Sequence, residues 1–159
     1  MVGNVPCNSQ VQKYGDQSEA LAMIASKNHV NGAQNPYAHM QKAFTVEQCN
    51  RVTDKNPYVA QPLRRTDCSL ISDGAAAMVV VAPEIAADLK RAIAFRATTH
   101  TNDVLALSRR DPTAFDGPRR AWAGSLGAAG LTLDDLDLVE THDCFTIAEL
   151  LEYEAMGLA

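Results

Sequence analysis

The sequence predicts an α/β fold in which helices lie on both sides of a mixed or parallel sheet. Residues 75–81 form a continuous apolar run, which is typical of a strand covered on both faces. Two further apolar segments, at 92–98 and 136–140, are predicted as strands and are separated by helical patterns. A chain of 159 residues is the size of one domain and can bury its own hydrophobic core.

The N-terminal region is predicted to begin with irregular structure. Residues 1–9 combine Gly, Asn, Pro and Cys without any periodicity. Asp16 or Ser18 can then cap a helix, because their side-chain oxygens accept hydrogen bonds from the first free backbone N–H groups. This helix should run to about Val30 and end at Asn31-Gly32, since glycine adopts the left-handed conformation at low cost.

The later elements are predicted from capping residues and turn composition. Thr45 and Gln48 have the spacing of a capping box for a short helix, whereas residues 54–67 are rich in Pro, Asn and Arg and predict a loop. Further elements are expected as a helix at 82–90 with Pro83 in its first turn, a helix from Gly117-Pro118 to Gly130, a short capped turn at 132–135, and a helix at 146–156 ended by Gly157.

Two glycines inside one predicted helix have a structural interpretation. Gly124 and Gly127 lie in the helix that ends at Gly130, and no strand precedes them. A phosphate-binding glycine loop follows a strand, so these glycines indicate close helix packing instead.

Composition and charge exclude several classes of protein. Apolar residues make up 47% and charged residues 21%, which excludes a disordered chain or a disulfide scaffold. The net charge of −5, with arginines only in scattered pairs, argues against a nucleic-acid-binding surface. No apolar stretch approaches the roughly 18 residues that a membrane span needs, and residues 1–12 do not resemble a signal peptide. The four cysteines lack C-x-x-C spacing and predict free thiols in a reducing compartment.

The polar segment T-H-D-C-F at 141–145 lies between the third predicted strand and the last predicted helix. α/β proteins place their chemistry at such strand ends. The N–H groups at the start of a helix favour negative charge, so a partly exposed Cys144 is expected to have a lowered pKa. Cys144 could then act as a nucleophile or proton shuttle, with His142 donating to a developing oxyanion. The alternative is that the His-Asp pair only caps the helix and Cys144 is a small buried hydrophobe.

A second polar cluster, D-C-S-L-I-S-D-G at 67–74, precedes the first predicted strand. Its hydroxyls could bind an amide-bearing ligand, and Gly74 would allow close backbone approach. The alternative is a polar turn whose side chains satisfy the local backbone. Neither cluster has the spacing of metal ligands, and the other histidines, His29, His39 and His100, lie apart, so no metal site is predicted.

Three motifs resemble motifs of the thiolase family, and they occur along the chain in the order in which the family has them. S-L-I-S-D-G-A-A-A at 69–77 resembles the turn and strand that close the N-terminal half of thiolases. H-D-C-F at 142–145 resembles the motif that sterol-carrier-protein-type thiolases have in place of N-E-A-F. K-N-H at 27–29 with N-P-Y-A at 35–38 is similar to the loop domain of that subfamily. The chain is therefore identified as an internal part of such a thiolase.

The resemblance implies a layered α/β/α/β/α fold, of which this chain holds only part. The implied division is the loop domain at 1–66, the end of the N-terminal half at 67–91 and the start of the C-terminal half at 92–159. The implied activity is that of an acetyl-CoA acyltransferase, either thiolysis of a 3-oxoacyl-CoA or the reverse Claisen condensation. Coenzyme A and acyl-CoA are then substrates, and no cofactor is permanently bound.

Site roles follow from the resemblance by position. His142 would help to form the oxyanion hole, and Cys144 would be the acid/base thiol. Ser69 would hydrogen-bond the pantetheine arm of coenzyme A, with Phe145 packing beside it.

The nucleophile of the family is not assigned by the motifs. It precedes the loop domain, and C-N-S at Cys7 formally matches its C-x-S pattern, but the surrounding residues do not resemble a strand-to-helix elbow, so Cys7 is not expected to be this nucleophile. The G-H-P histidine that activates the nucleophile is not found before Ala159. We therefore expect no thiolytic activity from this chain alone.

Two alternatives to an active thiolase remain. One is a noncatalytic CoA-thioester-binding protein or an auxiliary subunit of a steroid side-chain aldolase, and the other is a folded piece without activity. His142 and Cys144 favour thiolase chemistry, because a binder needs neither an oxyanion donor nor a poised thiol. For the full-length protein the resemblance implies a homodimer that uses acyl-CoA, without nucleic acid or a membrane span, in the cytoplasm, or in the peroxisome of a eukaryote.

Overall fold

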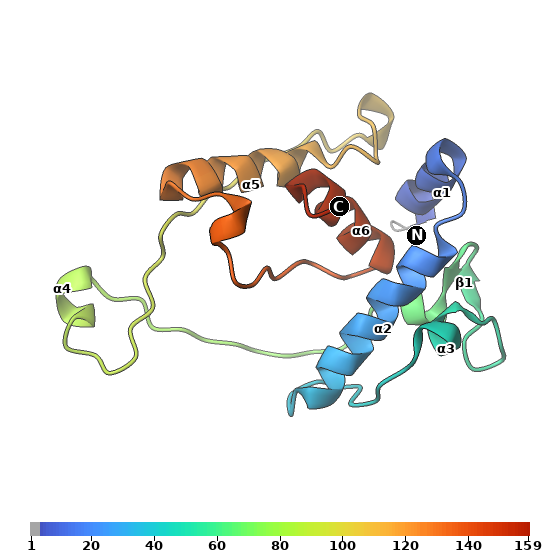
Figure 1. The fold of residues 1–159 in the computed structure, drawn as a ribbon, viewed down its shortest axis with the longest axis horizontal. Helices are drawn as coiled ribbons and strands as arrows, with labels where there is room; N and C mark the ends of the chain where they lie inside the picture. The colour runs from blue at the N-terminus through green and yellow to red at the C-terminus, as the bar shows by residue number, and fades with distance from the viewer. Residues whose placement is uncertain (1–3) are drawn as a thin grey trace.

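The computed structural model describes residues 4–159, which form six helices and one small sheet (Figure 1). The predicted loop domain starts at residue 1, and its residues 1–3 lie outside the described part. The elements are, in order, α1 (Asn4–Tyr14), α2 (Ser18–Gln34), α3 (Val46–Asn50), β1 (Tyr58–Ala60), β2 (Leu63–Arg64), α4 (Pro83–Ala86), α5 (Asp116–Ala129) and α6 (Thr146–Met156). Short 3-10 helices occupy Arg65–Asp67, Leu107–Arg109 and Leu133–Asp135.

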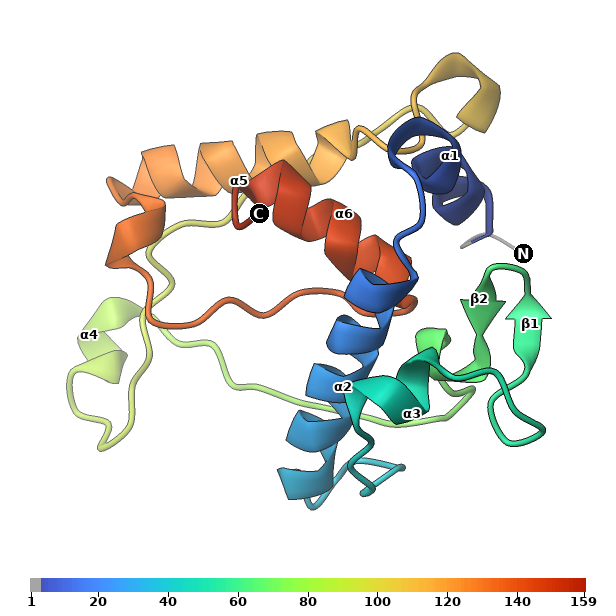
Figure 2. The same cartoon turned by 45° about the vertical axis from the view of Figure 1, so that its right-hand side comes forward.

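The core lies where α1, α2 and α6 meet the hairpin of β1 and β2. α6 lies between α5 and α2, as both ribbon views show (Figure 2). Each buried aliphatic side chain contributes about 1.5–3 kcal/mol, so this cluster holds α6 against the N-terminal elements. A smaller cluster joins Ala22 and Ala25 of α2 to Cys49 of α3. The buried members of the main cluster are Cys7, Leu21, Leu63, Ile147 and Leu151.

The N-terminal region is helical, so the prediction of irregular structure over residues 1–9 was wrong for the described residues. α1 begins at Asn4 and buries Cys7 completely in the main cluster. Gly15, with φ of 86°, follows α1 and permits the turn into α2. α2 continues through Gly32 to Gln34, beyond the predicted end at 31–32. For α1, packing of Cys7 against Ile147 and Leu151 of α6 outweighs a weak local preference.

The predicted loop at 54–67 contains a short hairpin. β1 and β2 pair in antiparallel fashion, with Tyr58 opposite Arg64 and Ala60 opposite Leu63. A 3-10 turn at Arg65–Asp67 follows directly and leads the chain towards α6.

The α/β class is confirmed, but the positions of the predicted strands are wrong. Among the described residues, 75–81, 92–98 and 136–140 pair with no neighbouring strand. Figure 1 shows residues 70–98 as an open excursion that carries the short helix α4 away from the other helices. The backbone N–H and C=O groups of a strand need a neighbouring strand as hydrogen-bond partner, so an apolar pattern alone does not produce a strand. The apolar side chains there are exposed, as at Met78, Val79, Val80, Ile93, Phe95 and Leu138.

Helices predicted from caps are confirmed, except that the helix expected at 82–90 shortens to α4. Thr45 Oγ1 accepts from the Gln48 N–H at 3.2 Å, and Gln48 Oε1 accepts from the Thr45 N–H at 2.9 Å. Asp135 Oδ2 similarly accepts from the Thr132 N–H at 2.8 Å. α5 and α6 end at glycines with positive φ, Gly130 and Gly157, as predicted.

No helix within residues 4–159 is long and apolar enough to span a membrane.

Candidate active site

The turn at 142–145 leads into α6 and lies against the segment that follows the hairpin. The Ser69 N–H donates to the carbonyl oxygen of Cys144 at 3.0 Å, and Cys68 forms an antiparallel bridge with Phe145. Thr146 Oγ1, at the start of α6, donates to Asp67 Oδ1 at 3.0 Å. The structure therefore brings Ser69 beside Cys144 and Phe145, from two segments far apart in the sequence. His142 precedes them on the same turn but is exposed and lines neither of the two cavities described below.

Each of the three residues before Cys144 is held by a side chain of another residue. Thr141 Oγ1 donates to Glu149 Oε1 at 3.0 Å. The backbone N–H of His142 donates to Glu152 Oε2 at 2.9 Å. Asp143 Oδ2 accepts from Asn28 Nδ2 of α2 at 2.9 Å.

The environment of Cys144 raises the pKa of its thiol, which corrects the expectation of a lowered value. Burial is the largest cause, and the carboxylates of Glu152 and Asp143 add to it. The N–H groups of Phe145 and Cys144 act in the opposite direction but do not compensate. The thiol is therefore protonated at neutral pH, a state suited to donating a proton and unsuited to resting nucleophilic attack.

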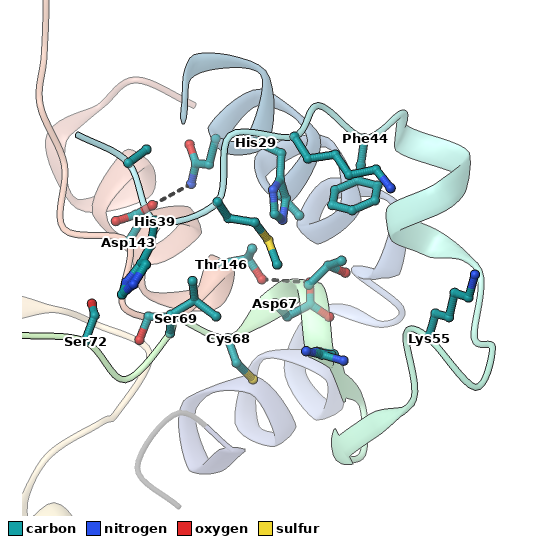
Figure 3. A pocket seen from close by; sticks show the side chains of 18 residues that line it. His29, His39, Phe44, Lys55, Asp67, Cys68, Ser69, Ser72, Asp143 and Thr146 are labelled. Atoms are coloured by element: carbon teal, nitrogen blue, oxygen red, sulfur yellow. Dashed lines mark hydrogen bonds between the residues drawn. The ribbon is translucent and has the colours of Figure 1, made fainter. Parts of the chain in front are cut away.

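A cavity of about 610 Å³ lies on one side of the turn. Figure 3 shows Ser69, Asp143 and His39 close together in its wall, with Lys55 at the opposite end. His29 stacks edge-on against Phe44 at 4.7 Å, and burial lowers the pKa of this histidine. Three cations, Lys42, Lys55 and Arg65, line the cavity and outnumber the two carboxylates there, Asp67 and Asp143. This surface can receive an anionic ligand.

A second cavity, of about 620 Å³, lies on the other side of the turn and is mainly apolar. Cys144 and Phe145 both line it, so Phe145 belongs to this cavity and not to the one that Ser69 lines. Phe115 also lines it and has φ of 45°, an uncommon backbone conformation for a residue other than glycine. The other lining residues include His100, Asp103, Arg110, Ile147 and Leu151. The turn thus separates a basic cavity from an apolar one.

Sequence reasoning missed three residues that hold the turn. Asn28 donates to Asp143 from α2, and Glu149 and Glu152 contact the turn from α6. No local sequence signal marked these carboxylates, because Glu149 and Glu152 lie on the opposite face of α6 from Ile147 and Leu151, where a helix pattern predicts exposed acidic residues. Both are nevertheless buried in the structure.

Cys7 has the properties of a structural cysteine. Its side chain is fully buried in α1, and burial raises its pKa to about 11. An activated nucleophile requires the opposite shift.

The described residues contain no group of three or more His, Cys, Asp or Glu side chains that could hold a metal ion.

Comparison with known proteins identifies the family. Residues 97–159 match the thiolase C-terminal domain-like family. An acetyl-CoA acetyltransferase of Methanothermobacter thermautotrophicus is 40% identical over 147 residues, which cover 91% of this chain and 37% of that protein. The chain belongs to the thiolase superfamily.

Other thiolase relatives cover this chain to a similar extent. The benzoylsuccinyl-CoA thiolase subunit BbsB of Thauera aromatica is 33% identical, over 99% of this chain and 41% of that protein. Sterol carrier protein 2 of Oryctolagus cuniculus is 31% identical, over 93% of this chain and 28% of that protein. This thiolase chain therefore spans well under half the length of these relatives.

Proposed function

We propose that this chain forms the coenzyme A side of a thiolase-type acyltransferase site, with Cys144 as the acid/base thiol. The hydrogen bond from the Ser69 N–H to the Cys144 carbonyl carries the proposal. This hydrogen bond joins Ser69, which lines the basic cavity, to Cys144, which lines the apolar cavity. A thioester lying across the turn would meet both cavities.

The two cavities suit the two ends of an acyl-CoA. Lys42, Lys55 and Arg65 can pair with the phosphates of coenzyme A, and Ser69 can hydrogen-bond the pantetheine arm. The apolar cavity, with Phe145 in its wall, can take the acyl group. His142, exposed at the turn, would donate to the thioester oxygen.

The proposed reaction is thiolysis of a 3-oxoacyl-CoA. A cysteine thiolate not assigned in this chain attacks the C3 carbonyl carbon, and the C2–C3 bond breaks with its electron pair on C2. His142 stabilises the charge on the thioester oxygen of this enolate, and Cys144 transfers its proton to C2, which releases acetyl-CoA. The Cys144 thiolate then takes the proton of an incoming coenzyme A thiol, whose sulfur accepts the acyl group and restores the nucleophile.

A noncatalytic binder is the second candidate. The name of the relative sterol carrier protein 2 and the apolar character of the second cavity favour a protein that holds a lipid thioester without cleaving it. Such a protein would bind acyl-CoA but would have no use for the proton of Cys144.

The remaining features of the proposal concern the whole protein. We retain the division into residues 1–66, 67–91 and 92–159, and the family match over 97–159 supports the start of the last part. Coenzyme A and acyl-CoA are substrates and not resident cofactors. A homodimer located in the cytoplasm, or in the peroxisome of a eukaryote, completes the proposal.

Calorimetric titration with coenzyme A tests the binding part. Ser69→Ala should weaken binding about 2- to 10-fold, the usual effect of one hydrogen bond. Ser125→Ala, on α5 and outside both cavities, is the matched control and should leave binding unchanged. The proposal would be contradicted if the unaltered chain did not bind coenzyme A, or if Ser69→Ala and Ser125→Ala bound it equally well.

A thiolysis assay on the same chain tests the expectation that it is inactive alone. Turnover that depends on Cys144 would overturn that expectation.

A further inference from the structure

Glu149 is a buried carboxylate on which four donors converge. Its side chain is only 1% exposed. Lys27 Nζ and the Tyr153 hydroxyl both donate to Oε1, as does Thr141 Oγ1 at 3.0 Å. Asn28 Nδ2 donates to Oε2 at 2.7 Å. Burial disfavours the ionised form, but the hydrogen bonds from Lys27, Tyr153 and Asn28 outweigh it and lower the pKa of Glu149.

Asn28 links this carboxylate to the turn. Its Nδ2 has two hydrogens, and the nitrogen lies within hydrogen-bond distance of Glu149 Oε2 at 2.7 Å and of Asp143 Oδ2 at 2.9 Å. The same side chain lines the basic cavity. One amide therefore touches the proposed coenzyme A site, the buried carboxylate and the residue that precedes Cys144.

Two helices thus hold three consecutive residues of the turn. Glu149 holds Thr141, Glu152 holds the His142 backbone, and Asn28 of α2 holds Asp143. We propose that Lys27, Asn28, Glu149 and Glu152 are positioning residues that fix His142 and Cys144 for proton transfer. This inference rests on the proposed function of the turn.

The chemistry of residue 28 is specific. An amide donates to two carboxylates at once, whereas an aspartate there would place a third carboxylate beside Asp143 and Glu149. An added negative charge near Cys144 disfavours its thiolate, and removal of the Glu152 charge favours it. Substitutions at 28 and 152 should therefore change the reactivity of Cys144 in opposite directions.

The test measures alkylation of Cys144 by iodoacetamide as a function of pH, with peptide mass spectrometry of the intact 159-residue chain. Asn28→Asp should slow alkylation at pH 8 about 3- to 10-fold and shift its pH profile upward, as expected for a pKa change of roughly half a unit to one unit. Glu152→Gln should accelerate alkylation and shift the profile downward. Asn31→Asp adds the same charge at an exposed position of α2 and should leave the rate unchanged.

Cys7 serves as an internal reporter of folding in the same samples, because it is fully buried and should stay unmodified. If Cys7 becomes alkylated in Asn28→Asp, that variant is not correctly folded. The alkylation rate and pH profile of Glu152→Gln then decide whether the inference holds. The inference is overturned if the folded variants react like the unaltered chain, or if Asn31→Asp has the same effect as Asn28→Asp. Coenzyme A titration reports separately on the proposed function, so failure of binding and failure of positioning are distinguishable.

Discussion

Asp67 connects the hairpin to α6 through a single buried side chain. Its Oδ2 accepts from the Arg64 N–H at 2.7 Å and from Arg64 Nε at 3.0 Å, and its Oδ1 accepts from Thr146 Oγ1. The side chains of Arg64 and Asp67 are only 3% and 0% exposed. Because Arg64 cannot lose its charge, it depends on Asp67 for compensation.

We predict that Asp67→Ala lowers the free energy of unfolding by about 3–5 kcal/mol, because it leaves the Arg64 guanidinium buried without a counter-charge. Urea unfolding measures the change. Asp135→Ala removes only an exposed capping hydrogen bond and should lower the free energy of unfolding much less. Equal losses for the two variants would show that the buried pair has no special role.

Glu149 and Glu152 should give opposite dependences of stability on pH. The pKa of Glu149 is lowered, so its contribution is present above the ordinary value of 4.5 and is lost as pH falls through the folded-state pKa. The pKa of Glu152 is raised, chiefly by burial, so its protonated form favours folding and this contribution is lost as pH rises through the folded-state pKa.

We therefore predict that Glu149→Gln destabilises the chain more at pH 7 than at pH 3. Glu152→Gln should instead stabilise it at pH 7 relative to the unaltered chain, because the amide oxygen can still accept from the His142 N–H. Urea unfolding at both pH values measures these differences. The same sign for both variants at pH 7 would contradict the assigned environments.

The motifs predicted Ser69, His142, Cys144 and Phe145 as site residues, and the fold places Ser69 beside the turn that carries the other three. Ser69 and Phe145 line different cavities, and His142 lines neither. Asn28 was not predicted as a site residue, because its partners lie more than 100 positions away and no local pattern reports such a contact. The pKa shift of Cys144 was predicted with the wrong sign, since the helix N-terminus was considered without the burial of the thiol, which is the largest cause, and without the carboxylates of Glu152 and Asp143.

Among the elements, α5 provides a matched pair of glycines. An added Cβ at Gly124 would lie 3.3 Å from Thr99 Cγ2, whereas one at Gly127 would meet nothing within 4 Å. The predicted role in close packing therefore holds for Gly124 and not for Gly127.

We predict that Gly127→Ala stabilises the chain by about 0.5–1 kcal/mol, because alanine loses less backbone entropy in a helix. In Gly124→Ala the contact with Thr99 should cancel or reverse this gain. Thermal unfolding compares the two variants. Equal stabilisation by both would mean that α5 does not pack against Thr99 as closely as the structure shows.

Helix ends and strands differ in how far local sequence decides them. The capping box at Thr45 and the terminal glycines Gly130 and Gly157 act within a few residues, so their helices were predicted closely. A strand needs a second strand to satisfy its backbone, and within residues 4–159 none lies beside 75–81 or 92–98. The apolar pattern there indicates segments suited to burial, but it does not show which element would cover them.

The whole molecule combines a packed site region with an exposed apolar excursion. α2, α6 and the segment after the hairpin all form hydrogen bonds with the turn at 142–145. In the excursion, by contrast, Val79 and Ile93 are 91% and 94% exposed. The chain covers 37% of the acetyl-CoA acetyltransferase of Methanothermobacter thermautotrophicus. The proposed acid/base thiol of Cys144 nevertheless lies beside the proposed coenzyme A site. Half-reactions that need only the proposed residues can therefore be examined on this chain.

Exchange of the acetyl-CoA methyl hydrogens for deuterium tests the central claim most directly, because it requires proton abstraction at C2 and an oxyanion donor but no cysteine nucleophile. In D₂O, followed by NMR, the chain should accelerate exchange, more strongly as pH rises towards the raised pKa of Cys144. Cys144→Ala should abolish the acceleration, whereas Cys49→Ala, a buried site away from both cavities, should retain it. Exchange no faster than in buffer, or unaffected by Cys144→Ala, would contradict the account.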